Sequence, residues 1–154
     1  MRPHHYIQKL MADALRANET LREAGVTVLE QNSQELAFLL KKPMAQIDAP
    51  VVVVTCDKAR KRHTQPAAWE LECSVMVTEN VPLNRERPGF LTALDVAFIA
   101  CEVLYDPQHR IHQTADPVKH TTPARGIFEA EARFAGRVMY NENEEQGEED
   151  GENN

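Results

Sequence analysis

Two histidines three residues apart, His109 and His112, form the pattern closest to a metal site in this 154-residue sequence, and His120 follows nearby. On a helix, this spacing would direct both imidazole rings toward one metal ion. The local sequence is more typical of a loop or strand, where residues i and i+3 face opposite sides. Asp106 and Asp116 flank the site, but no Cys or carboxylate cluster completes four ligands. We therefore expect solvated or locally hydrogen-bonded histidines, with no metal and no cofactor.

The three cysteines, Cys56, Cys73 and Cys101, include no C-x-x-C pair, so they do not indicate a disulfide framework. A catalytic cysteine needs an exposed thiol of low pKa beside a base. All three residues lie in or at the end of apolar patterns, which predicts buried free thiols. The sequence also contains no Gly-x-Ser-x-Gly motif and no glycine-rich phosphate loop. We expect no catalytic residues.

A basic segment, residues 58–63, is the densest local group of positive charges. It could contact nucleic acid or an acidic protein surface, or form a solvated hairpin tip. It contains no aromatic side chain for stacking on bases. The formal net charge is −7, but residues 141–154 contain seven acids and no base. Removing these seven from the 24 acidic residues leaves 17, which match the 17 lysines and arginines, and a neutral body argues against a dedicated nucleic-acid binder.

Residues 68–78 alternate between apolar and polar side chains, which predicts a central strand with one buried face. One face would carry Trp69, Leu71, Cys73, Val75 and Val77, and the other Ala68, Glu70, Glu72, Ser74, Met76 and Thr78. A second alternating run, residues 126–138, predicts a neighbouring strand, with Gly136 marking a bulge or a change of face. Glutamates lie on the predicted solvent-facing side of both strands, and they could form paired carboxylates. We expect them instead to keep the sheet soluble or to pair with basic side chains; they are Glu70, Glu72, Glu129 and Glu131.

The remaining elements follow from periodicity and from breakers. They are a helix at residues 5–24, a short strand at 26–29, a short helix at 32–42 capped by Asn32, a strand at 51–56, loops at 57–66 and 79–89, a helix at 89–105 and a weak strand at Ile111. The helix at 89–105 should cover the apolar face of the central strand, with Phe90 and Phe98 on its buried stripe.

This order predicts an α+β fold, a two-layer sandwich in which helices cover one face of a mostly antiparallel sheet of about four strands. Residues 1–140 would form a single domain, and residues 141–154 an acidic disordered tail. No apolar run approaches the roughly 20 residues that cross a bilayer. We expect a cytosolic protein without membrane contact.

The order of elements resembles the phage tail terminator family, the tail-completion proteins that take part in head-tail joining. The resemblance covers about residues 6–140 and is carried by the opening helix (7–21), the strand after Pro50 (51–54), the long strand (69–77), the covering helix (90–104) and the final strand (127–138). It implies a ring, with six subunits as the expected number, that caps the tail tube and presents the surface joined to the head.

If the resemblance holds, the protein is located in the virion tail and is assembled in the host cytoplasm. Its partners would be copies of itself, the tail-tube protein and the head-connector protein, and DNA would pass the ring without sequence-specific binding. The candidate interface residues are Lys58, Arg60, Lys61, Arg62, Glu70, Glu72 and Met76.

Two other functions stay open on the residues alone. A small cytosolic α+β enzyme or ligand-binding domain could use His109, His112 or the sheet glutamates. A nucleic-acid-associated accessory protein could use the basic segment at residues 58–63.

Overall fold

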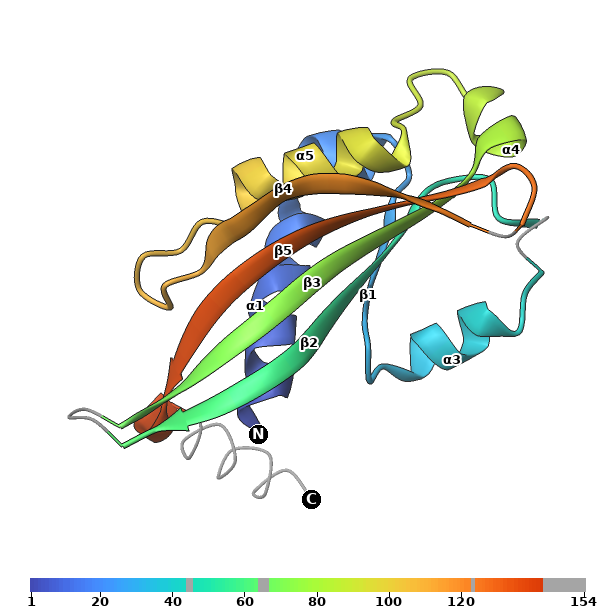
Figure 1. The fold of residues 1–154 in the computed structure, drawn as a ribbon. Coiled ribbons are helices and arrows are strands. Elements are labelled where there is room, and N and C mark those ends of the chain that lie inside the picture. The colour runs from blue at the N-terminus through green and yellow to red at the C-terminus, as the bar shows by residue number, and fades with distance from the viewer. Residues whose placement is uncertain (44–45, 64–66, 123, 143–154) are drawn as a thin grey trace.

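A computed structural model describes residues 1–43, 46–63, 67–122 and 124–142. It contains a five-stranded sheet in the order β1-β2-β3-β5-β4, with helices packed on it (Figure 1). β1 runs parallel to β2, and all other neighbours are antiparallel. The elements are α1 (Pro3–Ala17), α2 (Glu19–Glu23), β1 (Thr27–Glu30), α3 (Gln34–Leu40), β2 (Val51–Arg62), β3 (Ala68–Asn80), α4 (Val81–Arg85), α5 (Ala93–Val103), β4 (His112–Thr121) and β5 (Ile127–Met139).

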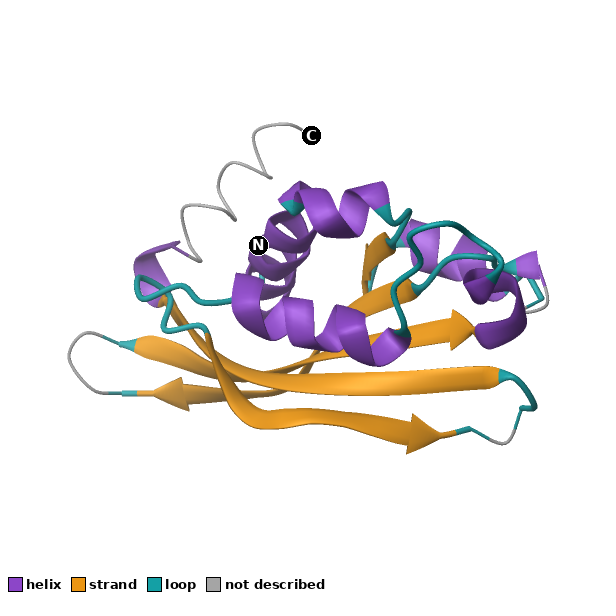
Figure 2. Cartoon of the chain, turned by 90° about the horizontal axis from the view of Figure 1, so that it is seen from above, coloured by secondary structure: helices purple, strands orange, loops and turns teal. Residues whose placement is uncertain are grey.

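Two layers make up the fold, as expected for an α+β sandwich, although the sheet has five strands rather than about four. α1 packs mainly on β1 and β2, and α5 packs on β3, β4 and β5. Figure 2 shows both helices on the same side of the sheet. We call this side the helix face and the opposite side the open face. The core between the layers includes Ile7, Met11, Leu15, Val52, Val54, Leu71, Cys73, Val75, Val77, Val96, Ala97, Ala100, Ala130, Ala132, Phe134 and Val138.

The alternation predicted for the central strand is confirmed, because β3 buries Leu71, Cys73, Val75 and Val77 on the helix face. β2 and β5 are its two neighbours, as predicted. Trp69 was predicted for the core but is only partly buried, at the end of the strand beside Tyr140. No register shift interrupts the β3–β5 pairing, so the predicted bulge at Gly136 is wrong for this pair of strands.

The covering helix is shorter than predicted, because Thr92 and Asp95 form a capping box that begins α5 at Ala93. Phe90 therefore lies outside the helix and is exposed. Phe98 was predicted on the buried stripe but is 53% exposed. The helix is apolar on nearly every side, so its period alone did not separate the buried Val96 and Ala100 from the exposed Phe98.

Polar caps correct the prediction at three other helix ends. The predicted helix at 5–24 is two helices, because Asn18 adopts an extended conformation and its side chain accepts a hydrogen bond from Leu21. Ser33, rather than Asn32, caps α3. The predicted loop at 79–89 contains α4, which is capped by Asn80.

Two strands are longer than predicted. β2 continues through the basic segment to Arg62, so the prediction of a loop at residues 57–66 is wrong for 57–62. The weak strand expected at Ile111 is instead β4, which begins at the next residue and forms an edge of the sheet. Both extensions are mostly exposed, so they lack the apolar alternation that predicts a strand.

Across the described ranges, no helix has the length and apolarity needed to cross a membrane. Residues 140–142 begin a helical turn after β5, and residues 143–154 of the predicted acidic tail lie outside the described residues.

Candidate interaction surface on the open face of the sheet

The open face of the sheet carries polar and charged side chains from four strands. On β3 it presents Glu70, Glu72, Ser74 and Met76, which alternate with the core residues. α3 packs on this face only at the β1–β2 edge, where Leu36 and Leu39 cluster with Leu29, Val51 and Val53. The long helices α1 and α5 lie on the other side of the sheet (Figure 2). The uncovered part of such a face is either solvated or a contact surface for another molecule.

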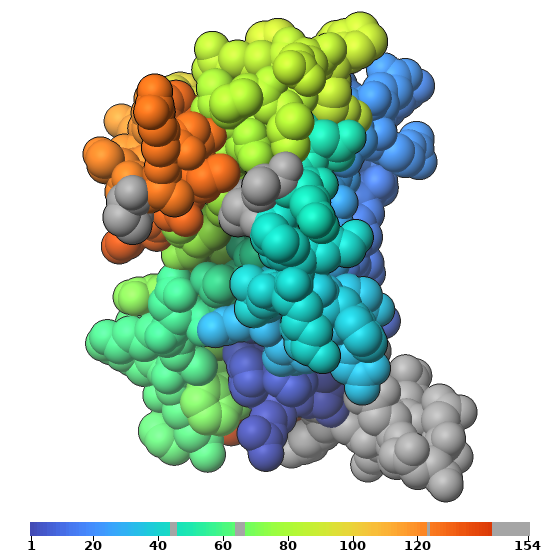
Figure 3. Space-filling model, turned by 90° about the vertical axis from the view of Figure 1, so that its right-hand side faces the viewer, coloured from blue at the N-terminus to red at the C-terminus, as the bar shows by residue number. Residues whose placement is uncertain are grey.

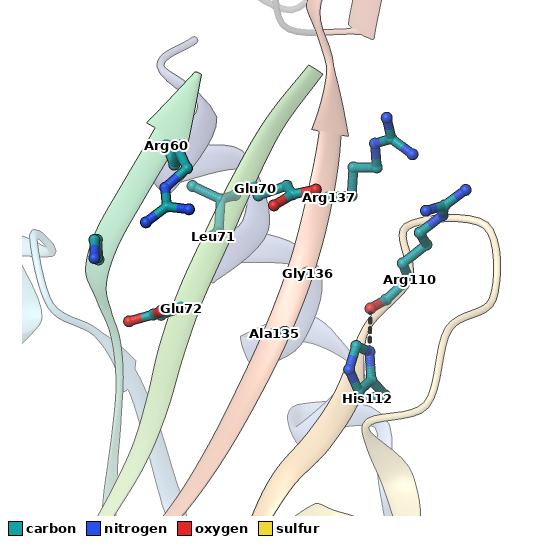
Figure 4. A pocket seen from close by; sticks show the side chains of 10 residues that line it. Arg60, Glu70, Leu71, Glu72, Arg110, His112, Ala135, Gly136 and Arg137 are labelled. Atoms are coloured by element: carbon teal, nitrogen blue, oxygen red, sulfur yellow. Dashed lines mark hydrogen bonds between the residues drawn. The ribbon is translucent and has the colours of Figure 1, made fainter. Parts of the chain in front are cut away.

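A cavity of about 310 Å³ lies on the open face at one end of the sheet. Figure 4 shows side chains from β2, β3, β5, the start of β4 and the turn before it around the cavity. Cross-strand pairing creates it, because Lys58 lies opposite Glu72, and Arg60 opposite Glu70. These four belong to the predicted interface residues. We call this site the basic cavity; its charged side chains are Lys58, Arg60, Glu70, Glu72, Arg110 and Arg137.

The other three predicted interface residues lie outside the basic cavity. Arg62 is adjacent and forms an ion pair with Glu70, with 2.9 Å between Nε and Oε2. Lys61 pairs with Trp69 on the other side of the sheet, and its Nζ lies 5.1 Å from the centroid of the Tyr140 ring. Met76 is half-buried farther along β3, in the middle of the open face. The structure thus brings together four of the seven residues and separates Lys61 and Met76 from them.

Sequence reasoning missed Arg110, His112 and Arg137 as members of the basic cavity. Arg137 continues the wet side of the alternating β5 run, so its position in the period could have identified it. Arg110 lies in the turn before β4 with a left-handed φ of 49°, and its carbonyl accepts a 2.7 Å hydrogen bond from Nδ1 of His112. No sequence pattern relates this turn to β2 or β3.

The basic cavity has an excess of positive charge. Four of its residues are cationic and two are acidic, and Glu70 is already paired with Arg62. Lys58, Arg60, Arg110 and Arg137 form no ion pair with any described residue. In addition, the buried Nε of Arg137 has no hydrogen-bond partner in the described part of the chain. A guanidinium without a partner in a net positive cavity is suited to bind a carboxylate or a phosphate.

A separate polar network crosses the middle of the open face. The hydroxyl of Ser74 lies 2.5 Å from Oδ2 of Asp57 and 3.2 Å from Oε1 of Glu131. Glu131 also accepts hydrogen bonds from His120 (2.7 Å) and Arg133 (2.8 Å). Burial raises the pKa of Glu131, but the hydrogen bonds from His120 and Arg133 outweigh this effect and hold the pKa below its ordinary value. The network links all four antiparallel strands.

The histidines are locally hydrogen-bonded, but one of them is buried rather than solvated. His109 lies under the helix layer against Tyr6. Its Nδ1 is 2.8 Å from Asp106, and its Nε2 is 3.2 Å from Glu142. Burial raises the pKa of Asp106, but the hydrogen bonds and charge of His109 outweigh this effect, so the pKa lies below its ordinary value. The described residues contain no group of three His, Cys, Asp or Glu side chains arranged to hold a metal ion.

Two cysteines are cross-strand neighbours, which sequence reasoning did not detect. Cys56 on β2 lies opposite Cys73 on β3. Cys73 is buried, but Cys56 and Cys101 are only half-buried, so the prediction of three buried thiols holds for Cys73 alone. The hydrogen bond between the paired thiols raises the pKa of Cys73, with burial adding to the rise, and lowers the pKa of Cys56.

Comparison with known proteins gives a fold relationship. No family model matches the sequence, and no curated protein matches it. Among solved structures, the chain is similar to a chain described as part of the virion of a native gene transfer agent particle. The TM-score is 0.55 at 14% sequence identity, over 86% of this chain and 94% of that chain. At this identity the likeness shows a shared fold that extends over nearly the whole of both chains.

Proposed function

We propose that this protein is a structural component of a phage or prophage particle, rather than an enzyme. The observation that carries the proposal is the fold likeness to a chain of a gene transfer agent virion, which leaves little of either chain unmatched. The order of elements, independently of that likeness, resembles the tail terminator family. We therefore propose that the protein caps the tail tube as a ring, with six subunits expected, and forms the surface that joins the tail to the head.

Exposed apolar side chains support an assembly role. Phe38 and Leu40 on α3 are 68% and 75% exposed, whereas Leu36 and Leu39 on the same helix pack against β1 and its surroundings. Figure 3 shows the α3 segment at the molecular surface. Phe98 on α5 is exposed as well. Clusters of exposed apolar side chains are characteristic of protein contact sites, so these helices are candidates for contacts with the tail tube or the head connector.

The open face would meet the next subunit in such a ring. It carries charges of both signs that could pair across the boundary. Met76 lies at its centre, half-buried between Val53 and Glu131 of the neighbouring strands. DNA would pass through the ring without sequence-specific binding.

Molar mass in solution tests the ring. Light scattering of the full chain, alone and with purified tail tubes, should give a species of about six times the 17.4 kDa chain mass. Met76→Glu places an extra carboxylate at the centre of the open face and should dissociate the ring. The matched control Arg22→Glu alters an exposed residue of α2 in the helix layer and should leave the ring intact. A monomer under both conditions would contradict the ring.

Particle morphology tests the role in joining. Electron microscopy of particles assembled without this protein should show heads and tails that are not joined, with tail tubes of irregular length. Particles of normal length with attached heads would contradict the proposed role, whatever the oligomeric state of the isolated protein.

A further inference from the structure

We propose that the basic cavity binds the acidic C-terminal segment, residues 143–154, of a second copy of this chain. The inference rests on the proposed ring and adds a specific contact between its subunits. The cavity supplies four cations without ion-pair partners among the described residues, and the buried Nε of Arg137 lacks a hydrogen-bond acceptor there. Carboxylates are the natural partners of such guanidinium groups.

The chain itself carries a matching ligand. Residues 143–154 contain six acids and no base, including two adjacent Glu-Glu pairs at 144–145 and 148–149. A cavity of about 310 Å³ accommodates a few side chains of an extended segment. Glu70 and Glu72 inside the cavity would repel the continuous phosphate charge of a duplex, whereas a peptide can place its glycines and amides beside them. These features favour a peptide carboxylate over DNA.

Glu142, the last described residue before the segment, lies on the side of the sheet opposite the basic cavity. Glu142 is held on the helix side, where its Oε1 lies 3.2 Å from Nε2 of His109, and its Oε2 accepts a hydrogen bond of 3.2 Å from the Met139 amide. The basic cavity opens on the other side of the sheet. Twelve residues span at most about 40 Å when extended. This reach is enough to cross a subunit boundary, and the neighbour's cavity does not require the chain to turn back around its own sheet.

Carbodiimide cross-linking with isotope mixing tests the contact on the full chain. The reagent joins a carboxylate directly to an amine in contact with it, and Lys58 is the lysine of the cavity. In an equal mixture of ¹⁴N- and ¹⁵N-labelled protein, mass spectrometry should find Lys58 joined to residues 144–152 with both isotopes in the same product. Lys9, an exposed lysine on α1, is the control and should give far fewer links.

Charge variants give the quantitative readout. Arg60→Glu should lower the yield of the mixed-isotope link about fivefold, the order expected for loss of a contact between exposed charges. Arg22→Glu changes an exposed arginine on α2 and should leave the yield unchanged. Replacing the six acids of residues 143–154 with Gln and Asn should abolish the link and should not reduce folding, which circular dichroism would verify.

Four outcomes would overturn the inference. Links within single-isotope products only would assign the segment to its own chain, and equal links at Lys9 and Lys58 would show non-specific contact. The cavity would be assigned to nucleic acid if the protein bound a short DNA duplex in a salt-sensitive way, if Arg60→Glu abolished that binding, and if no mixed-isotope link formed. A protein that forms rings but gives no mixed link refutes this inference and leaves the proposed function standing, whereas a monomer in the mass measurement refutes the ring itself.

Discussion

The carboxylate of Glu79 connects the end of β3 to helices α4 and α5, and its removal should destabilise the fold. Glu79 is 1% exposed at the end of β3. Its Oε1 accepts a hydrogen bond of 3.0 Å from the Ala93 amide in the first turn of α5, and its Oε2 accepts one of 2.7 Å from the Asn84 side chain on α4. A buried charge is tolerated only when it is hydrogen-bonded, and the N-terminus of a helix favours a negative one.

The magnitude follows from what Glu79→Gln changes. Glutamine keeps the volume but replaces one accepting oxygen with an NH₂ group, which then faces a donor. A hydrogen bond to a charged group contributes roughly 1.5–3 kcal/mol. Loss of the favourable charge at the helix terminus adds up to about 1 kcal/mol. We therefore expect the free energy of unfolding to fall by about 2–4 kcal/mol, a large part of the roughly 5–15 kcal/mol that stabilises a domain.

Urea unfolding followed by the fluorescence of Trp69 measures this loss. All variants must be compared at one protein concentration, because association of subunits adds to the apparent stability. Glu72→Gln is the matched control, since Glu72 is exposed on the same strand and the change should stay within about 0.5 kcal/mol. A loss below about 1 kcal/mol for Glu79→Gln would refute the reasoning, because neither hydrogen bond would then contribute as a charged one.

Three further predictions concern the core, a thiol and the polar network. Gly136→Ala should lower the free energy of unfolding in urea by about 1–3 kcal/mol, because its Cβ would lie 2.9 Å from Cδ1 of the buried Ile7. Ile7→Val removes that methyl group and should relieve part of the loss. If the losses of the two single variants simply add in the double variant, the clash is contradicted. Iodoacetamide should alkylate Cys56 at lower pH than Cys101, because the thiol of the neighbouring strand lowers the pKa of Cys56 and burial raises that of Cys101; equal pH profiles by mass spectrometry would count against it. Folding lowers the pKa of Glu131, so the stabilisation from its carboxylate is fully present above the ordinary pKa of 4.5 and is lost as the pH falls through the lowered value. Glu131→Gln should therefore make the free energy of unfolding less dependent on pH in that acidic range. The same pH dependence in both proteins would disprove the contribution.

The strands with the clearest alternation could be predicted from sequence, because one face of each lies against the core. In β3 and β5 the apolar period of two matches burial along most of the length, from Leu71 to Val77 and from Ala130 to Phe134. A buried face fixes such a period strongly, since a slip by one residue would expose the whole apolar set. The same logic gave the correct neighbours of the central strand.

Elements without a one-sided apolar pattern could not be predicted in this way. β4 is exposed along most of its length, so its strand conformation depends on pairing with β5 rather than on its own residues. α5 has the opposite character, being apolar on nearly every side, and the prediction placed Phe98 in the core where the structure buries Val96 and Ala100. Close packing of this helix on the sheet favours small residues at the contact, a preference that hydrophobicity alone does not reveal.

The basic cavity depends on a single extra residue in β2. Between Cys56 and Lys58 the pairing with β3 shifts by one, and Asp57 is the residue left over. Without this bulge, Lys58 would pair with Leu71 and Arg60 with Trp69, which would turn both cations toward the helix face. The bulge instead places Lys58 and Arg60 opposite Glu72 and Glu70 on the open face.

The bulge relieves a like-charge contact, because an unshifted Asp57 would lie directly opposite Glu72. The positions opposite Leu71 and Trp69 on the helix face are then taken by Ala59 and Lys61, which are both exposed. In the bulge, the carboxylate of Asp57 accepts hydrogen bonds from the hydroxyls of Thr55 and Ser74, with oxygen–oxygen distances of 3.1 Å and 2.5 Å. The sequence contains all of these residues, but the position of the bulge follows from the pairing of two strands, which a pattern along one strand does not specify. The assignment of Lys58 and Arg60 to a shared surface therefore required the three-dimensional register.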